Sequence, residues 1–339
     1  MASTKVRFLY LSQQEVIAAG LTMAEVTALC TQSLKEHGLK EVENPPKPGV
    51  HPLPNAFIHA MPAWLKQTGA CGMKWVAGFP TNVQKKIPTI AGLIVLNDTT
   101  TGFPLAVLDG TYITGLRTAA VSGVGAKFLA RPDSEVLGIV GTGVQGKYNT
   151  LVLTHLLPSI KTVKIFDKWR PSIDHYIEDL TPVLGENIKI EVVESCEQAI
   201  TEADVVVTAT GKVTEPIFFE RWVKPGALVL PVHAGGWEKE VLTKMDMVVV
   251  DDWPQFVSMT ESLYTQVPED AAVELGEIVA GKKAGRQNAQ QRIINFNLGL
   301  AIHDIIVGTK ALEKAKEKGL GTTLDLIDLA APIPLPPVE

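Results

Sequence analysis

VLGIVGTGVQGKYNTLVLTHLL, residues Val136 to Leu157, is the stretch that decides the fold of this chain. An apolar run leads directly into a turn containing Gly141, Gly143 and Gly146, and a segment compatible with a helix follows. The first glycine permits a tight turn, the second lets the backbone approach a pyrophosphate, and the third lets the helix pack closely on the strand. The start of such a helix offers unpaired N–H groups to phosphates. The stretch therefore predicts a dinucleotide-binding unit.

A second apolar run, residues 162–166, ends at Asp167, which follows the glycine turn at about the twenty-residue distance typical of such units. A carboxylate at this position accepts hydrogen bonds from the ribose hydroxyls of an adenosine. It would also repel a 2′-phosphate, which favours NAD over NADP. Lys168 and Arg170 follow closely, so NADP remains possible.

Composition narrows the class of protein. A chain of 339 residues suits two domains or one large one, and 46% hydrophobic with 20% charged residues describes a globular protein with ample core. The net charge of −6 gives no reason to expect a nucleic acid or a membrane surface as a partner. The N-terminus lacks the apolar core of a signal peptide, and no metal-ligand spacing is present. We therefore predict a cytoplasmic protein without a bound metal, with three unpaired cysteines: Cys30, Cys71 and Cys196.

The order of the predicted elements indicates an α/β protein, with a Rossmann-like domain beside a discontinuous α+β domain that binds substrate and dimerises. Strands at 87–98 and 104–108 form a predicted hairpin, and a helix over 111–130 carries many small residues. A long helix is predicted from about 289 through 308, and the tail should pack back on the N-terminal part. The predicted boundaries are 1–118 with 309–339 for the substrate domain, and 119–308 for the Rossmann domain. The predicted parallel strands are 136–140, 162–166, 188–193, 204–209, 227–232 and 247–250.

Two cations, Lys74 and Arg117, interrupt otherwise apolar segments ahead of the glycine turn. Burying a charge without a partner costs several kcal/mol, so each needs a carboxylate or a phosphate nearby. Either they form an internal ion pair with an Asp or Glu, or they bind an anionic ligand. The residues by themselves leave both interpretations open.

A series of motifs resembles the ornithine cyclodeaminase/μ-crystallin family, in the family's order and over most of the chain. The motifs lie at 74–80, 88–89, 95–109, 116–120, 126–133, 141–146 and 297–301. The resemblance implies a homodimer with an NAD(P)-binding Rossmann domain. It also implies that Lys74 and Arg117 hold the carboxylate of an amino or imino acid beside the nicotinamide, with Lys47 as a looser match to another basic substrate contact. The positions matching cofactor contacts are Thr89, Arg117, Val144, Gln145 and Asp167, with Thr208 as a softer match.

One segment departs from the family pattern. Cyclodeaminases carry an aspartate after the fifth Rossmann strand, whereas Gly236 or Trp237 falls at that position here. Neither side chain transfers protons, so cyclisation with loss of ammonia is disfavoured. The proton for the reaction would come from Lys74, if burial lowers its pKa, from His233, or from a bound water. His303 and Asp304, in the predicted long helix, are interpreted as structural.

These observations predict an NAD(H)-dependent oxidoreductase acting on the C–N bond of a small α-amino or α-imino acid, as an imine reductase or an amino-acid dehydrogenase. One alternative is an ornithine or lysine cyclodeaminase, which would recycle NAD within each turnover. The other alternative is a non-enzymatic binding protein like μ-crystallin, with the dinucleotide site retained.

Overall fold

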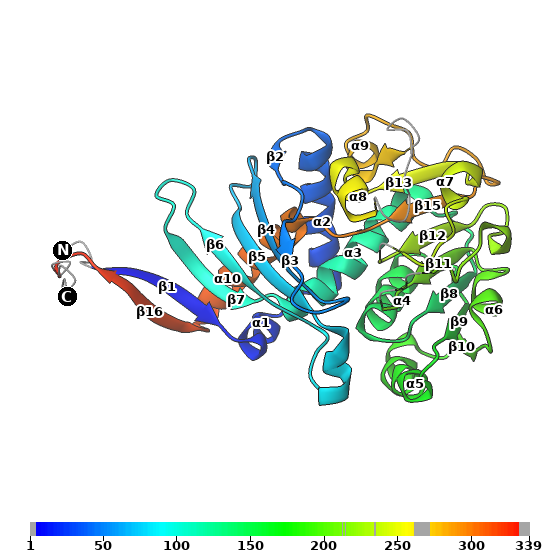
Figure 1. Cartoon of the computed structure of the whole chain (residues 1–339), viewed down its shortest axis with the longest axis horizontal. Coiled ribbons are helices and arrows are strands. Elements are labelled where there is room, and N and C mark those ends of the chain that lie inside the picture. Colours follow the sequence, from blue (N-terminus) through cyan, green and yellow to red (C-terminus); the bar gives the residue numbers. More distant parts are fainter. Residues whose placement is uncertain (1–4, 212, 214, 234, 261–271, 332–339) are drawn as a thin grey trace.

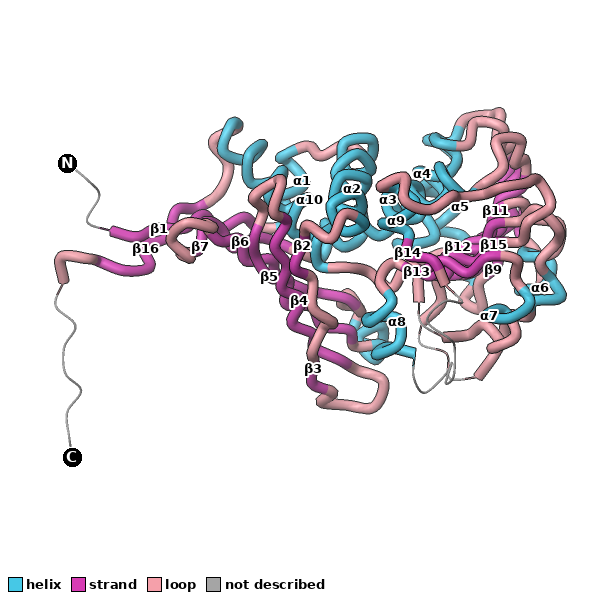
Figure 2. The backbone as a smooth tube through the Cα atoms, turned by 90° about the horizontal axis from the view of Figure 1, so that it is seen from above, coloured by secondary structure: helices cyan, strands magenta, loops and turns pink. Residues whose placement is uncertain are grey.

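The computed structural model describes residues 5–211, 213, 215–233, 235–260 and 272–331. Within these residues the chain forms two eight-stranded sheets, separated along the long axis of the molecule (Figure 1). Helices α2 (Met23–Gly38) and α3 (Thr111–Leu129) lie between the two sheets in both views (Figure 2). The α/β class and the Rossmann-like architecture predicted from the sequence are confirmed.

The first sheet has the order β16-β1-β7-β6-β5-β4-β2, and β3 pairs with β4. The predicted hairpin is present, because β6 and β7 pair antiparallel. At the far end, β1 and β16 pair antiparallel and project as an arm (Figure 1). The strands are β1 (Lys5–Leu11), β2 (Val42–Glu43), β3 (Gly49–Val50), β4 (Phe57–Leu65), β5 (Cys71–Gly78), β6 (Ile90–Asn97), β7 (Pro104–Asp109) and β16 (Thr322–Asp328).

Helices cover one face of this sheet. The helix α10 (Ala301–Glu317) contacts β4, β5 and β6, and α1 (Gln13–Ala19) contacts β7. Capping boxes open α1 and α2, with Ser12 and Thr22 as the N-cap residues. The opposite face remains apolar and uncovered, since the paired side chains of Trp75 and Leu93 are each 45% exposed.

The second sheet is parallel throughout, with the order β10-β9-β8-β11-β12-β15-β13-β14. All six predicted strands are present. The strands are β8 (Val136–Val140), β9 (Thr162–Phe166), β10 (Lys189–Val192), β11 (Val205–Thr208), β12 (Leu228–Pro231), β13 (Met247–Val250), β14 (Val273–Glu274) and β15 (Ile293–Phe296). The helices of this part are α4 (Val144–Leu156), α5 (Arg170–Leu184), α6 (Cys196–Ile200), α7 (Val241–Lys244), α8 (Trp253–Thr260) and α9 (Leu275–Val279), with 3₁₀ turns at Pro80–Lys85 and Glu220–Trp222.

The predicted helix from 289 to 308 is wrong. Residues Ile293–Phe296 form β15, which is fully buried between β12 and β13, and the helix begins only at Ala301. Short β-branched and aromatic runs fit a buried strand, and Gly299 at φ +89° interrupts any helix across this segment. The sequence prediction also missed β14.

The tail returns to the first sheet, as expected, because β16 pairs with β1. The tail from 309 to 339 ends in a proline-rich segment, of which residues 332–339 lie outside the described residues. Helix α3 contacts α2 on one side and α4 on the other, so it runs through the junction near the first predicted boundary. The division at 118/119 and 308/309 stays a prediction.

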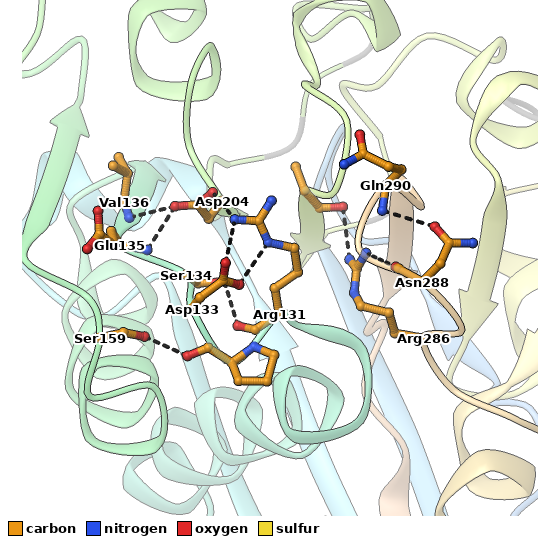
Figure 3. Close-up of polar contacts among 12 residues, drawn as sticks. Arg131, Asp133, Ser134, Glu135, Val136, Ser159, Asp204, Arg286, Asn288 and Gln290 are labelled. Atoms are coloured by element: carbon orange, nitrogen blue, oxygen red, sulfur yellow. Dashed lines mark hydrogen bonds and ion pairs between the residues drawn. The ribbon is translucent and has the colours of Figure 1, made fainter.

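A polar network fixes the amino ends of the central Rossmann strands (Figure 3). One carboxylate oxygen of Asp204 accepts the N–H groups of Glu135 and Val136 at 2.8 and 3.0 Å. Its other oxygen forms ion pairs with Lys224 at 2.8 Å and Arg131 at 3.6 Å. Strands β8 and β11 therefore start in a fixed register, and their carboxyl ends form the opposite edge of the sheet.

Among the described residues, no single helix has the length and apolar composition of a membrane span, although α1 and α2 reach that threshold jointly across a 94° bend. No group of three His, Cys, Asp or Glu side chains within the same residues has the arrangement of a metal site. Cys30, Cys71 and Cys196 are free.

Candidate active site

The glycine turn has the local geometry that its sequence predicts. Gly141 has φ +99°, and a Cβ there would lie 2.5 Å from the carbonyl oxygen of Ala209. A Cβ on Gly146 would lie 2.2 Å from the carbonyl oxygen of Gly141, so α4 packs directly on the turn. A Cβ on Gly143 would meet open space, on the residue that precedes the 13-residue helix α4. The turn thus fits a pyrophosphate at the helix N-terminus.

Asp167 lies at the end of β9 beside this turn. One carboxylate oxygen accepts the N–H and the hydroxyl of Thr142 at 2.9 and 3.1 Å, and the other accepts the Trp169 N–H at 3.0 Å. Two oxygens with about four lone-pair sites still leave capacity for a ribose hydroxyl. The position fits the predicted role in NAD binding.

The remaining predicted cofactor residues differ in their placement. Val144 is exposed at the first turn of α4, and Gln145 donates its amide N–H to the carbonyl of Gly115 in α3 at 3.4 Å. Thr208 lies on β11 beside β8, where its hydroxyl accepts the Trp237 indole N–H at 3.1 Å. Thr89 is exposed just before β6. Val144, Gln145 and Thr208 thus lie at the edge that carries the glycine turn, and the cofactor contact of Thr89 stays a prediction.

The two predicted cations meet at one carboxylate. Lys74 on β5 lies 2.6 Å from one oxygen of Asp304, and Arg117 on α3 donates Nε–H to the other at 3.0 Å. All three side chains are buried, with relative exposures of 1, 6 and 0% in the order Lys74, Arg117, Asp304. The internal ion pair left open by the sequence is therefore present. Asp304, which the sequence interpretation took as structural, is the carboxylate that both cations share. An aspartate on the buried face of an apolar helix was a usable signal for this pairing.

Lys47 joins the same cluster through the linker between β15 and α10. Its Nζ donates to the carbonyls of Leu298 and Gly299 at 2.8 and 3.2 Å. Gly299 packs closely against Arg117: a Cβ at Gly299 would lie only 2.5 Å from Nη1 of the guanidinium. Lys47, the looser match to a substrate contact, therefore lies close to the other two cations.

Several cationic donors in this cluster keep free capacity. Each ammonium has three donors, and the contacts above occupy two on Lys47. Lys74 contacts Asp304 and, at 3.4 Å, the Thr114 hydroxyl. Within the described part of the chain, no side chain or carbonyl accepts a hydrogen bond from Nη1 or Nη2 of Arg117. Lys74 and Arg117 share the Asp304 carboxylate and Lys47 donates only to carbonyl oxygens, so the donors that remain suit an additional anion of carboxylate size.

Burial dominates the protonation of these groups. It lowers the pKa of Lys74 to about 7, an effect that Arg117 reinforces and Asp304 opposes. It lowers the pKa of Lys47 to about 8. Burial alone would raise the pKa of Asp304, but the charges of Arg117 and Lys74 hold it below its ordinary value. Lys74 therefore exchanges its proton near neutral pH while Asp304 stays ionised.

Comparison with known proteins identifies the family. The ornithine cyclodeaminase/mu-crystallin family model matches residues 9–319. The chain belongs to this family.

Relatives within the ornithine cyclodeaminase/mu-crystallin family match nearly full length. A nodulation efficiency protein, NfeD, of Rhizobium meliloti is 37% identical over 315 residues, covering 92% of this chain and 97% of the relative. The Thermococcus litoralis Δ1-pyrroline-2-carboxylate reductase, solved with NADH and L-proline, is 31% identical, with TM-score 0.84 and coverage of 93 and 99%. An archaeal alanine dehydrogenase dimer with bound NAD is 30% identical, with TM-score 0.84 and coverage of 95 and 100%. Thus homologues are NAD-dependent oxidoreductases on C=N or CH–NH₂ groups.

In the segment where cyclodeaminases carry an aspartate, this chain has the buried indole of Trp237. Trp237 is packed against Phe218 at a 5.3 Å ring distance and bonded to Thr208, so it lies within the Rossmann core. Gly236 adopts φ +95°, a left-handed conformation suited to glycine.

His233, the other predicted proton donor, is less suited to that role. Burial lowers its pKa to about 4, so the imidazole is neutral at neutral pH. Its Nε2 lies 3.5 Å from the Thr210 hydroxyl. Among the described residues, no ion pair or hydrogen bond links His233 to Lys74, Arg117 or Asp304. Its catalytic role stays a prediction.

Proposed function

We propose that this chain is an NAD(H)-dependent oxidoreductase acting on the C–N bond of a small α-amino or α-imino acid. The observation that carries the proposal is the set of unused donors on Arg117, Lys47 and Lys74, which converge around Asp304 and Gly299. Arg117 lies two residues beyond Gly115, whose carbonyl accepts the Gln145 amide at the start of α4. The anion site and the dinucleotide site are thus joined through α3.

The residues support a division of labour. Arg117 and Lys47 would anchor the substrate carboxylate, which converts a bimolecular encounter into a positioned transfer. A nicotinamide bound at the glycine turn would supply or accept the hydride. Lys74, with a pKa of about 7 caused mainly by burial, is the better candidate than His233 to give a proton to the imine nitrogen or take one from the amine. The homologous reductase and dehydrogenase support NAD as the cofactor.

The proposal is tested by following NADH absorbance with cyclic imines and with 2-oxo acids plus ammonia or methylamine, and NADPH in parallel. We expect net NADH consumption that depends on the substrate carboxylate. Arg117→Ala should lower kcat/KM by about a hundredfold, the scale of losing charge-assisted hydrogen bonds. Arg131→Ala, at the opposite edge of the Rossmann sheet, serves as the control. An Arg117→Ala variant with unchanged turnover and unchanged carboxylate binding would refute the assignment.

The same assay separates the two alternatives. A cyclodeaminase would release ammonia from ornithine or lysine with no net change in NADH. A binding protein would bind NADH and a carboxylate ligand without turnover of any imine.

We further propose that two copies pair through the uncovered face of the first sheet, where Trp75, Leu93 and Leu105 are exposed. An apolar patch of this kind on a sheet face is typical of an interface between proteins. The dimeric alanine dehydrogenase supports this assembly. Light scattering after size exclusion should give a dimer mass, and Trp75→Glu should shift it toward the monomer. A monomeric wild type would contradict the proposal.

A further inference from the structure

The carboxyl end of β13 carries two consecutive buried aspartates with different partners. Asp251 accepts the Gly299 N–H at 2.6 Å, and its other oxygen accepts the Asp252 N–H at 3.1 Å. Asp252 instead contacts the His37 ring at 3.0 Å and accepts the Gln255 N–H at 2.8 Å. Asp251 therefore reaches the linker beside the cation cluster, whereas Asp252 ties the same strand end to α2 and starts α8.

Gly299, whose N–H donates to Asp251, contacts both Lys47 and Arg117. The Gly299 carbonyl accepts Lys47 Nζ at 3.2 Å and the Gln255 amide at 3.1 Å. The Gly299 Cα lies against the guanidinium of Arg117, with no room for a side chain. Its φ of +89° is a left-handed conformation that glycine adopts readily. The hydrogen bond that the Gly299 N–H donates to Asp251 thus helps to fix the residue that contacts both Lys47 and Arg117.

The negative charge of Asp251 has a separate effect. A neutral amide oxygen would accept the Gly299 N–H equally well, so the hydrogen bond alone does not require an acid. The charges that act on Asp251 are those of Lys47 and Asp252. Those that act most on Lys47 are Asp251, Arg117 and Asp304, and Lys47 also interacts with Lys74 and His59. Burial lowers the pKa of Lys47 to about 8, and Asp251 opposes that effect. Burial raises the pKa of Asp251 to about 6, and Lys47 opposes that effect. Asp251 therefore helps Lys47 to remain protonated.

We propose that Asp251 is a positioning residue of the substrate-carboxylate site, holding Gly299 in place and keeping Lys47 cationic. This inference rests on the proposed function, because it takes Lys47 and Arg117 as the carboxylate anchors. Asp251 itself contacts neither substrate nor cofactor and acts through the linker between the two sheets.

The first readout does not depend on catalysis. The rate of acetylation of Lys47 by acetic anhydride, followed by peptide mass spectrometry as a function of pH, reports its pKa. Asp251→Asn keeps an acceptor for Gly299 and removes the charge. The pH at which the acetylation rate of Lys47 is half-maximal, its midpoint, should therefore fall by about one pH unit. Asp252→Asn is the matched control, since it lies at the same strand end and is also buried, and its midpoint should stay at the wild-type value. An unchanged midpoint in Asp251→Asn, or an equal shift in both variants, would overturn the charge role.

The second readout is kinetic. At pH 7.5 the KM for the carboxylate substrate should rise about tenfold in Asp251→Asn and about a hundredfold in Asp251→Ala, with kcat changed less than about threefold. The KM rise should grow with pH, because Lys47 loses its proton earlier. The dissociation constant for NADH, from fluorescence titration, should stay unchanged in both variants. A KM like that of wild type in Asp251→Ala would overturn the positioning role, as would an equal loss of NADH affinity.

The two proposals fail in different ways. If the wild type neither turns over imino acids nor binds a 2-oxo acid, the proposed function fails, while the Lys47 midpoint still tests the coupling to Asp251. If the wild type is active and the Asp251 variants match it in KM and midpoint, the further inference fails alone.

Discussion

Removal of the Asp304 carboxylate is the most direct test of the buried cluster. Asp304→Ala leaves Lys74 and Arg117, which are 1 and 6% exposed, without their shared counter-ion. Breaking a buried ion pair from one side costs about 3–5 kcal/mol, because the remaining charge stays desolvated. Loss of the Lys74 proton reduces part of that cost, because a neutral amine is less costly to bury, and burial already lowers the pKa of Lys74 to about 7. Arg117 has no such escape, because a guanidinium stays charged.

The sign of the pH dependence follows from this difference. Without Asp304, the folded-state pKa of Lys74 falls further below its unfolded value. The extra destabilisation is fully present at pH values below that lowered pKa, and it disappears as pH rises past about 7, where Lys74 is neutral in both folded proteins. We therefore expect a loss in free energy of unfolding of about 3–5 kcal/mol at pH 6 and a smaller loss at pH 9.

Urea denaturation followed by tryptophan fluorescence measures both values. The matched control is Glu313→Ala on the same helix, where an exposed pair with Lys310 at 2.9 Å should contribute at most about 1 kcal/mol. A loss in Asp304→Ala no larger than in the control, or one independent of pH, would refute the account of the cluster.

Three further predictions concern the reaction and its selectivity. The rate of imine reduction should fall as pH rises through about 7 and that of amino-acid oxidation should rise, with both dependences lost in Lys74→Met, because the lysine proton is the one exchanged; pH–rate profiles test this. Gly299→Ala should raise the KM for carboxylate substrates about tenfold or more, since its Cβ would lie 2.5 Å from Arg117 Nη1. Gly319 also has a positive φ, but a Cβ there would meet no atom within 4 Å, so Gly319→Ala should leave KM unchanged in the same kinetics. Asp167→Asn should raise the NADPH to NADH ratio of kcat/KM about tenfold or more by removing repulsion of the 2′-phosphate, and an unchanged ratio would contradict the NAD assignment.

The sequence predicted best where the constraints are local. The turn at Gly141 and the helix contact at Gly146 depend on neighbours within a few residues, so the pattern alone was sufficient. Lys74 and Arg117 also stood out, because charges in apolar segments need partners wherever those partners lie.

The partner of these cations was the part that sequence reasoning missed. Asp304 lies 187 positions from Arg117 in the chain and was assigned to a helix that was also placed wrongly. The run Ile293–Phe296 is too short for its periodicity to separate helix from strand. Its identity as β15 comes from insertion between β12 and β13, which is a non-local pairing. No sequence pattern connects Asp251 to Gly299, because the two residues lie 48 positions apart in the chain.

The position of α10 in the chain has a consequence for biosynthesis. The first sheet is made almost entirely from residues 5–109, yet its helix α10 and its edge strand β16 are translated after the Rossmann strands. During synthesis, Lys74 and Arg117 emerge long before Asp304. Until α10 is made, the sheet face that α10 covers stays exposed and these two cations lack their carboxylate partner. The Rossmann strands between them have all their sheet partners by residue 296. The first sheet can therefore be completed only after the strands of the Rossmann sheet have been synthesised.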